Sequence, residues 1–339
     1  MPATLADVAA HIGLSLPTVA CILRGDDARF REATIKRVQR AANELGYRPN
    51  TSARAMATGR FDMVGMLVPA SRMQWRNAPP PQQAGILATL RRHRCRLLIC
   101  EVPDESAGAL SQELPHLLRE WSTDGLLLDA TASPALTAAV EALAIPAIWI
   151  NSLLPANCVL PDDAGAGAVA ARHLLALGHR TLGVAGRAFV MPAGQRHHSA
   201  DARWSGAVAA CAEFRAVCHG PYAFAPAKEL DSGCALLRAQ PTVTAWIACG
   251  GQEAANLYVA AMRLGLRVPE DVSIIAIDAN PDAWIGTPFT TVELDWGGVG
   301  RQAAEDLITR RDSGGTATPA RIMGTMLTLG TTTGAPRSA

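Results

Sequence analysis

The feature that most constrains this chain is an alternation of apolar strands and helices, which begins near residue 61 and continues almost to the C-terminus. Seven segments have the near-continuous apolar pattern of buried strands: residues 63–68, 96–101, 125–129, 146–151, 181–185, 245–249 and 272–278. Helical patterns lie between them, notably at 164–177 and 252–264. Such strands are typical of parallel sheets that helices cover on both faces. So many units predict two similar α/β lobes, with a ligand cleft between the carboxyl ends of their strands.

A second pattern, at residues 4–24, predicts two short helices joined by a tight turn. The first helix has Leu5, Val8, Ala9 and Ile12 on one face; the second turns Val19, Ile22 and Leu23 inward and Leu16, Pro17, Ala20 and Cys21 outward. Gly13 ends the first helix, and Ser15 can cap the second. A helix-turn-helix of this kind places its second helix in the major groove of DNA, whereas an ordinary αα-hairpin has no such partner.

The residues after this pair predict a third helix and, after it, a short segment with only a weak helical tendency. A helix that starts near Glu32 and ends at Gly46 carries one apolar face, formed by Ile35, Val38, Ala42 and Leu45. This face can complete a three-helix core, and Pro49 prevents the helix from continuing. Residues 50–58 allow only about two turns of helix, which is too short to be stable alone in water. We therefore expect that segment to form a helix only when it packs against something.

Charge is distributed unevenly along the chain. Residues 1–60 carry nine basic and five acidic side chains, whereas the remaining residues carry 22 basic and 25 acidic side chains. A basic head on a mildly acidic body fits a nucleic-acid-binding module attached to another function. A solvated basic surface without a partner is the alternative.

Several other classes of protein are not supported by the sequence. The N-terminus lacks the pattern of a signal peptide, and no apolar run approaches the roughly 20 residues that cross a bilayer. We therefore expect a cytoplasmic, nucleoid-associated protein without a membrane partner. Eight scattered cysteines, with no C-x-x-C, predict free thiols. The chain lacks a phosphate loop and a G-x-S-x-G, so we expect no enzyme activity and no cofactor. His197 and His198 are adjacent, and adjacent residues on an extended segment point in opposite directions, so we expect no metal site.

Motifs along most of the chain resemble the LacI/GalR family of transcriptional repressors. In the head they are Thr4, Asp7–Ala9, Gly13, Ser15, Thr18, Val19, Thr34, Val38, residues 45–50, Ala53 and Arg54. In the body they are His173, Leu174, residues 178–180, Arg203, Gly206, residues 265–273, Asp278 and residues 288–292. The resemblance implies an N-terminal all-α helix-turn-helix head and an α/β two-lobed periplasmic-binding-protein-like sensor domain.

The resemblance also implies a division of the chain and its partners. Residues 1–49 are expected to form the helix-turn-helix DNA-binding domain, 50–60 the hinge helix or linker, and 61–339 the ligand-binding dimerisation domain. Its first lobe is expected at about 61–160 and 292–322, and its second at about 161–291 and 323–330. A homodimer is expected to bind double-stranded operator DNA that is nearly palindromic. Met56 stands where the family inserts an apolar wedge into the minor groove.

The DNA-binding residues that the resemblance implies are Thr4, Leu5, Ser15, Leu16, Pro17, Thr18, Cys21, Arg24, Thr34, Tyr47, Asn50, Ala53 and Met56. The recognition helix departs from the family pattern, because Ala20 and Cys21 replace the usual Ser-Arg. That arginine commonly reads guanine, so a donor worth about 1–3 kcal/mol of discrimination is lost. Leu16 and Pro17 also lack side-chain donors. We therefore expect apolar contacts with thymine methyls, and phosphate contacts that supply much of the affinity.

The effector-binding residues that the resemblance implies are Ser71, Trp75, Asn151, Arg203, Gly250, Asp278 and Trp296. Gly250 and Gly251 replace the family's usual Asn-Asp, which predicts a roomier pocket with fewer acceptors. A sugar, a sugar acid or a related metabolite is the expected effector, and a larger, less hydroxylated or anionic ligand also fits. Arg203 and Asp278 have a structural alternative, which is to pair with each other. The sequence leaves open a corepressor role for the ligand, a solute-binding protein of the same fold, and a sugar-processing α/β enzyme.

Overall fold

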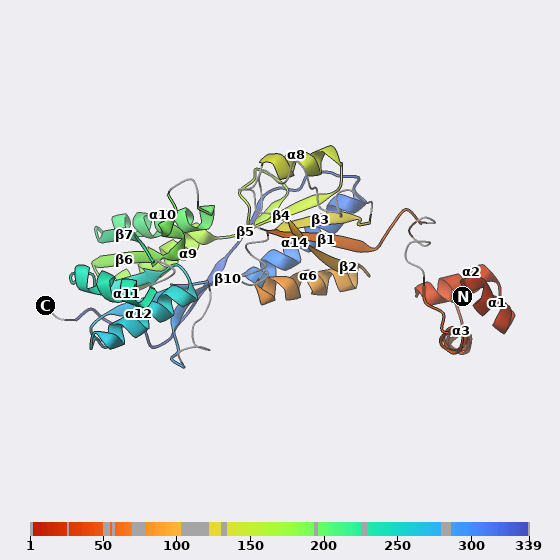
Figure 1. Cartoon of the computed structure of the whole chain (residues 1–339), viewed down its shortest axis with the longest axis horizontal. Helices are drawn as coiled ribbons and strands as arrows, with labels where there is room; N and C mark the ends of the chain where they lie inside the picture. The colour runs from red at the N-terminus through yellow and green to blue at the C-terminus, as the bar shows by residue number, and fades with distance from the viewer. Residues whose placement is uncertain are drawn as a thin grey trace. The chain divides into compact units, whose positions relative to one another are not determined.

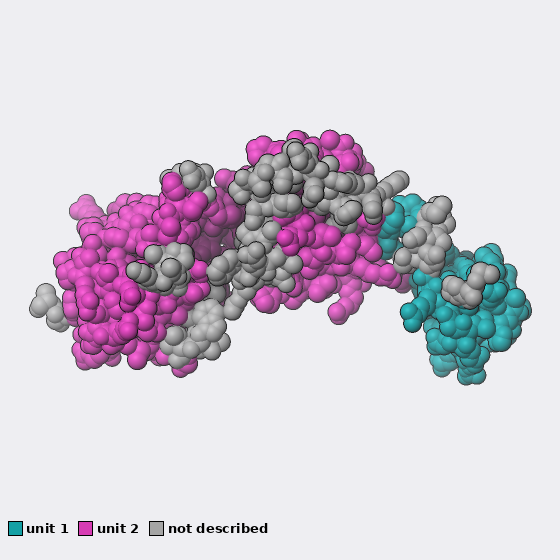
Figure 2. Space-filling view, in the orientation of Figure 1, with its two compact units in different colours: residues 1–62 teal, residues 63–339 magenta. Residues whose placement is uncertain are grey.

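The computed structural model describes residues 3–25, 27–49, 55, 58–69, 79–102, 122–129, 134–192, 196–224, 229–278 and 286–337. They belong to two compact units, residues 1–62 and residues 63–339, which Figure 2 colours separately. The first unit contains the predicted helix-turn-helix and the second contains the predicted strands and helices. The predicted fold class is confirmed.

The head is a three-helix unit whose turns follow from its sequence. Its helices are α1 (Leu5–Ile12), α2 (Leu16–Arg24) and α3 (Glu32–Glu44), and the axes of α1 and α2 meet at 113°. Thr4 caps α1 in a capping box with Asp7, and Ser15 accepts a hydrogen bond from the Thr18 amide at the start of α2. Gly13 ends α1 at φ 62°, a left-handed conformation that glycine adopts without strain. The steep angle is that of a helix-turn-helix.

The core of the head is small and apolar. Its buried members are Val8, Ala9, Val19, Ile22, Val38, Ala41 and Ala42. The inward face predicted for α2 is confirmed at Val19 and Ile22, while Leu23 is half-buried against the same core. Leu16 stays 47% exposed on the opposite side of α2. The head thus uses one face of α2 for its own folding and leaves the other available for a partner.

The second unit contains two six-stranded sheets (Figure 1). The first sheet has the order β11-β5-β4-β3-β1-β2 and is parallel throughout. Its strands are β1 (Met63–Pro69), β2 (Arg96–Val102), β3 (Gly125–Asp129), β4 (Ala147–Ile150), β5 (Cys158–Pro161) and β11 (Arg321–Met323). The helices of this lobe are α6 (Pro80–Arg92), α8 (Pro134–Ala142) and α14 (Trp296–Asp312).

The second sheet has the order β12-β10-β9-β8-β6-β7, and only β12 runs antiparallel to its neighbour. Its strands are β6 (Thr181–Gly186), β7 (Val217–Ala223), β8 (Ala245–Ala248), β9 (Ser273–Ile277), β10 (Thr290–Leu294) and β12 (Thr325–Thr328). The helices are α9 (Asp163–Ala176), α10 (His198–Glu213), α11 (Glu229–Ala239) and α12 (Gly251–Arg263), and a short 3₁₀ helix, η3, spans Arg187–Val190.

The chain passes between the two lobes three times. It leaves β5 for α9 at Asp162, leaves β10 for α14 at Asp295, and leaves β11 for β12 at Gly324. The second passage lies later than the expected boundary at residue 292. The Asp162 amide donates to the Met323 carbonyl at 2.8 Å, so neighbouring crossover segments are hydrogen-bonded. Because β5 and β10 both end at this boundary, the carboxyl ends of the parallel strands of both sheets face it.

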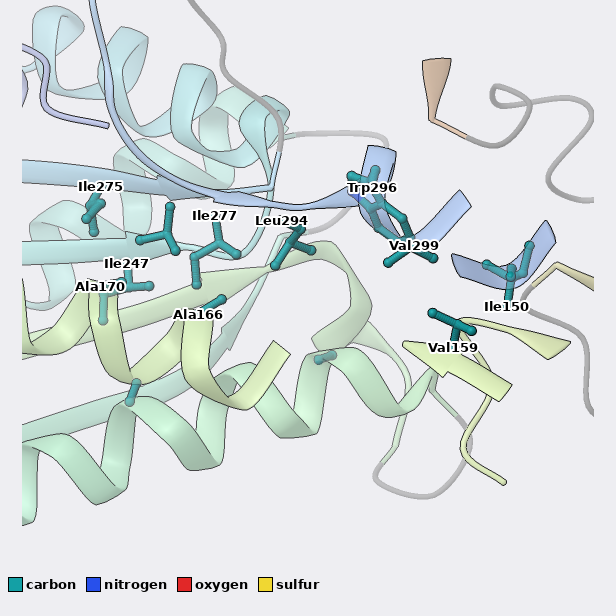
Figure 3. Packing of buried hydrophobic residues seen from close by; sticks show 14 of the residues in the cluster. Ile150, Val159, Ala166, Ala170, Ile247, Ile275, Ile277, Leu294, Trp296 and Val299 are labelled. Carbon is teal, nitrogen blue, oxygen red and sulfur yellow. The ribbon is translucent and has the colours of Figure 1, made fainter. Parts of the chain in front are cut away.

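One apolar cluster continues across the boundary. Figure 3 shows Leu294 and Trp296 between Ile277 of the second lobe and Val299 of the first. Trp296 is only 7% exposed although it begins a helix at the crossover. Relative movement of the lobes must therefore repack side chains around this tryptophan.

The segment after β12 is fastened to the second lobe by buried threonines. Thr332 is fully buried; its hydroxyl donates to the Ile274 carbonyl at 2.6 Å and accepts from the Thr290 amide at 3.1 Å. His179 is also buried, and its ring nitrogens lie 2.7 Å from Thr244 Oγ1 and 2.9 Å from the Gly334 carbonyl. These bonds join β9, β10 and the C-terminal segment.

Acid is expected to destabilise this second lobe through its histidines. Burial lowers the pKa of His179 and of His173 below the ordinary value of 6.5. The unfolded chain therefore binds protons at a higher pH than the folded chain. Stability should be fully present above a pH of about 6.5 and should fall as the pH drops below it. Urea unfolding of the wild type and of His179→Gln, between a pH of about 7.5 and 5.5, measures this effect. If the free energy of unfolding depended on pH equally in the two proteins, the assigned role of His179 would be contradicted.

Candidate functional site

The outer side of α2 presents the first group of predicted site residues. Leu16, Pro17 and Arg24 are exposed, and Thr18 and Cys21 are half-buried. Other predicted DNA-binding residues serve the head itself: Thr4 and Ser15 are helix caps, and Leu5 and Tyr47 pack against the head core, while Thr34 is half-buried in the first turn of α3. Asn50, Ala53 and Met56 lie outside the described residues. The exposed surface of α2 is thus apolar at its N-terminal end and cationic at its C-terminal end.

Cys21 lies between two arginines on this surface. Arg24 Nη2 is 3.4 Å and Arg29 Nη2 is 3.0 Å from Cys21 Sγ. From the sequence a role was predicted for Arg24 alone; Arg29 was missed because it lies in the loop after α2, where helical spacing does not indicate which side chains meet. The two guanidiniums bring positive charge to the place where the family pattern has its arginine.

The Cys21 thiol is expected to react at unusually low pH. The hydrogen bond from Arg24, with a smaller contribution from Arg29, lowers the pKa of Cys21 below the ordinary value of 9.0. The pH at which alkylation by iodoacetamide is half-maximal should therefore be lower for Cys21 than for Cys100, whose pKa burial raises. Peptide mass spectrometry after timed labelling measures both sites. Arg24→Ala should raise the midpoint for Cys21, and an unchanged midpoint in that variant would be evidence against the contact.

The second group of site residues lies at the ends of strands in the two-lobed unit. Asn151 directly follows β4, Asp163 follows β5 by one residue, and Asp278 directly follows β9. Asn151 has φ 52° and Asp278 has φ 81°, so both non-glycine residues adopt the left-handed conformation. Such strain, of order 1–3 kcal/mol for a residue held there, clusters at functional sites. The carboxyl edge of both sheets therefore carries polar side chains on constrained backbone.

Arg203 is the centre of this group. It lies on α10 and is 8% exposed, and its Nε donates to Asp163 Oδ1 at 2.7 Å. Its Nη1 donates to the Cys249 carbonyl, and its Nη2 is 3.7 Å from Asp278 Oδ2. Burial opposes the charge, but the two carboxylates outweigh burial and hold the pKa of Arg203 above its usual range. The predicted alternative, an Arg203–Asp278 pair, is present together with a closer partner that was not predicted, Asp163.

Trp296 and Asp278 connect the lobes. The Trp296 indole N–H, at the start of α14 in the first lobe, donates to Asp278 Oδ1 in the second. The same aspartate thus faces both Trp296 and Arg203. A ligand that enters between the lobes must compete with, or rearrange, this link.

Glu253 fills the space that the glycine pair leaves. Gly250 is the residue before α12, and a Cβ added to it would meet Glu253 Oε2. Glu253 is 8% exposed, and its Oε1 accepts from the Arg187 amide at 3.0 Å. The expectation of a roomier site with fewer acceptors is therefore wrong at this position, because a carboxylate three residues further along the helix occupies it. Ser71 and Trp75 lie outside the described residues.

His197 and His198 do not point in opposite directions, contrary to the sequence argument. Their ring centroids are 4.2 Å apart, and their Nε2 atoms lie 3.0 and 3.2 Å from the Asn151 carbonyl oxygen. The argument assumed an extended segment, whereas α10 begins at His198 and turns the chain there. The two rings connect the second lobe to the first.

The described residues contain neither a cluster arranged for a metal ion nor a single helix that could span a membrane. No group of three or more His, Cys, Asp or Glu side chains there is arranged to hold a metal ion. Over the same residues no single helix is long and apolar enough to cross a membrane, and only the bent pair α1–α2 passes jointly, by length and composition.

Comparison with known proteins covers both units. The family model described as bacterial regulatory proteins, lacI family, matches residues 4–50, and a periplasmic binding protein-like domain matches residues 171–333. The ribose operon repressor of Haemophilus influenzae is 26% identical over 91% of this chain and 92% of that protein. The transcriptional regulator MalR of Streptomyces coelicolor is 28% identical over 99% of this chain and 98% of that protein.

Solved structures show the same fold. The Lac repressor dimer bound to operator and the anti-inducer ONPF superposes with a TM-score of 0.80 at 21% identity, covering 99% of this chain and 100% of that one. A LacI family regulator from Mycobacterium smegmatis is 27% identical with a TM-score of 0.63, covering 81% of this chain and 100% of that one. The helix-turn-helix head and the two-lobed unit therefore match in the order in which the chain carries them, and the chain belongs to the LacI/GalR family of transcriptional regulators.

Proposed function

We propose that this chain is a ligand-responsive repressor, active as a homodimer, which binds a nearly palindromic operator and is released from it by a small-molecule effector. One observation carries the proposal. A single chain joins a helix-turn-helix head to two lobes at whose boundary Arg203, Asp163 and Asp278 meet. The names of relatives, among them a ribose operon repressor, support carbohydrate or related catabolic genes as the targets.

The head supplies operator recognition in this proposal. Its domain comprises residues 1–49, followed by the hinge at 50–60, where Asn50, Ala53 and Met56 remain the proposed DNA contacts. Leu16 and Pro17 would contact thymine methyls, because they are exposed and apolar. Arg24, with Arg29 beside it, would provide phosphate or base contacts near the end of α2.

The lobes supply regulation. The effector would shift a balance between two arrangements of the lobes, and it can do so only by its different affinity for each, typically about 1–3 kcal/mol of coupling. Two links across the boundary would change with that arrangement: Trp296 to Asp278, and the histidine pair to the Asn151 carbonyl. The first lobe begins with β1, directly after the hinge, so its movement would alter hinge folding and hence operator affinity.

Selection of bound duplexes from a random DNA pool tests the DNA-binding half of the proposal. The full chain should enrich a near-palindromic sequence, and Arg24→Ala should weaken binding to it. Arg172→Ala is the matched control, because it removes another exposed arginine, one that pairs with Glu213 in the second lobe. No enrichment over non-specific binding would overturn the proposal. A strict guanine requirement that survives Arg24→Ala and vanishes in Cys21→Ala would overturn the proposed mode of base reading.

A further inference from the structure

The charges described at the lobe boundary are unbalanced. Asp163 and Glu253 are more than nine-tenths buried, and Asp278 is 30% exposed; two of these carboxylates, those of Asp163 and Asp278, face one guanidinium, that of Arg203. The Cys249 thiol adds no charge, because burial raises its pKa to about 12. Arg187 reaches Glu253 through its backbone amide, while its guanidinium donates to Gln252 Oε1.

The guanidinium of Arg203 is already engaged by the protein. Its Nε is bound to Asp163 at 2.7 Å and its Nη1 to the Cys249 carbonyl. The remaining Nη2 faces Asp278 Oδ2 at 3.7 Å. An anionic ligand that approached Arg203 would lie beside both carboxylates and would be repelled by them. The arginine therefore orients the two aspartates and offers little to a carboxylate or phosphate.

Buried hydrogen-bond acceptors that lack a donor lie at the same lobe boundary. Asp163 Oδ2 and Asn151 Oδ1 are buried and have no hydrogen-bond partner, and both belong to side chains at least 96% buried. The indole N–H of Trp296, a donor at this boundary, is taken by Asp278. A buried acceptor that lacks a donor is costly, and a ligand that donates hydrogen bonds removes that cost.

We propose that the effector is a polyhydroxylated compound with a protonated amine, such as an amino sugar, and that the site discriminates against sugar acids and sugar phosphates. The amine lies against Asp163 and Asp278, and hydroxyl groups donate to the remaining oxygens. This inference rests on the proposed function, since it assumes that the ligand site is the effector site. It narrows the sequence expectation, which included anionic ligands.

Binding of matched ring compounds tests the proposal. The probes are the amine, hydroxyl and uronate members of the gluco, galacto and manno series, titrated against the full chain by calorimetry and thermal unfolding. In the series that binds most tightly, the amine should bind at least about tenfold more tightly than the uronate. A uronate that binds as well as the amine, or a failure of every amine to bind, would overturn the inference.

Single-residue variants test which carboxylates cause the preference for the amine over the uronate. Asp278→Asn and Asp163→Asn should each reduce the ratio of amine affinity to uronate affinity by about tenfold. Two positions are mutated separately, so that if one variant folds poorly the other still tests the assignment. Asp231→Asn is the control, because it removes an exposed carboxylate on α11 that pairs with Arg263 and should leave the ratio unchanged. Equal ratios in all four proteins would overturn the assignment to these carboxylates.

Operator release separates the inference from the proposed function. If an amine binds but the operator stays bound at saturation, the ligand chemistry stands and the regulatory function fails. If a uronate releases the operator and the amine does not, the regulatory function stands and the inference fails.

Discussion

Replacing Arg203 with alanine is expected to lower the free energy of unfolding by about 3–5 kcal/mol, because removal of one partner leaves a buried charge without compensation. The carboxylate most affected is Asp163, whose side chain is 3% exposed and which is bound by Arg203 at 2.7 Å. Urea unfolding followed by tryptophan fluorescence measures the change. The same variant should lose affinity for the effector, because the guanidinium holds Asp163 and Asp278 in place.

Two companion variants make this prediction specific. The double variant Arg203→Ala with Asp163→Asn should recover part of the lost stability, since it removes the uncompensated charge. Arg172→Ala breaks an ion pair with Glu213 in which both side chains are about half exposed, and it should cost no more than about 1 kcal/mol. Equal losses in Arg203→Ala and Arg172→Ala would show that the buried cluster is not what stabilises this edge.

The second large effect is expected where α9 and α10 cross. A Cβ added to Gly167 would lie 2.8 Å from the carbonyl carbon of Arg203, and closer still to its oxygen. Because backbone atoms cannot rotate away, Gly167→Ala should push the helices apart and cost about 1–3 kcal/mol. It should also weaken effector binding, since the displaced turn carries Arg203.

The control for this variant lies on the same helix. Ala164 is exposed although its backbone packs against Gly206 of α10, so Ala164→Ser adds only a hydroxyl on the solvent side of the same helix contact and should change stability by less than about 0.5 kcal/mol. Chemical unfolding and calorimetric titration of both variants measure the two effects. A Gly167→Ala protein as stable as Ala164→Ser would mean that the helices are not packed at this close distance.

The parts of the fold that could be predicted are those with one dominant local signal. The faces of α1 and α2, and strands such as β3 and β9 that are buried along their whole length, follow from apolar spacing. Strands β7 and β10 were not predicted. β7 is an edge strand interrupted by Gly220 and Pro221, and β10 mixes threonines and a glutamate with its apolar residues. Their place in the sheet is decided by neighbours far away in the sequence.

In the candidate site, too, contacts between residues far apart in the sequence left no local signal to predict them. Arg203 and Asp278 were found through the family pattern, and their mutual approach was foreseen as an alternative. Asp163 was overlooked because only a helix, at residues 164–177, was predicted beside it; its place between the buried strand β5 and that helix is the signal that could have identified it. Glu253 gave no local signal, because its role depends on the missing side chain of Gly250.

Ligand-dependent repression is tested most directly by the affinity of the full chain for its selected operator, measured by fluorescence anisotropy with and without a saturating ligand identified by thermal shift. The ligand should weaken operator binding by roughly 5- to 150-fold, the range of a typical coupling energy. This change should be lost in Arg203→Ala while operator binding without ligand persists. A ligand that binds the lobes and leaves operator affinity unchanged would contradict it.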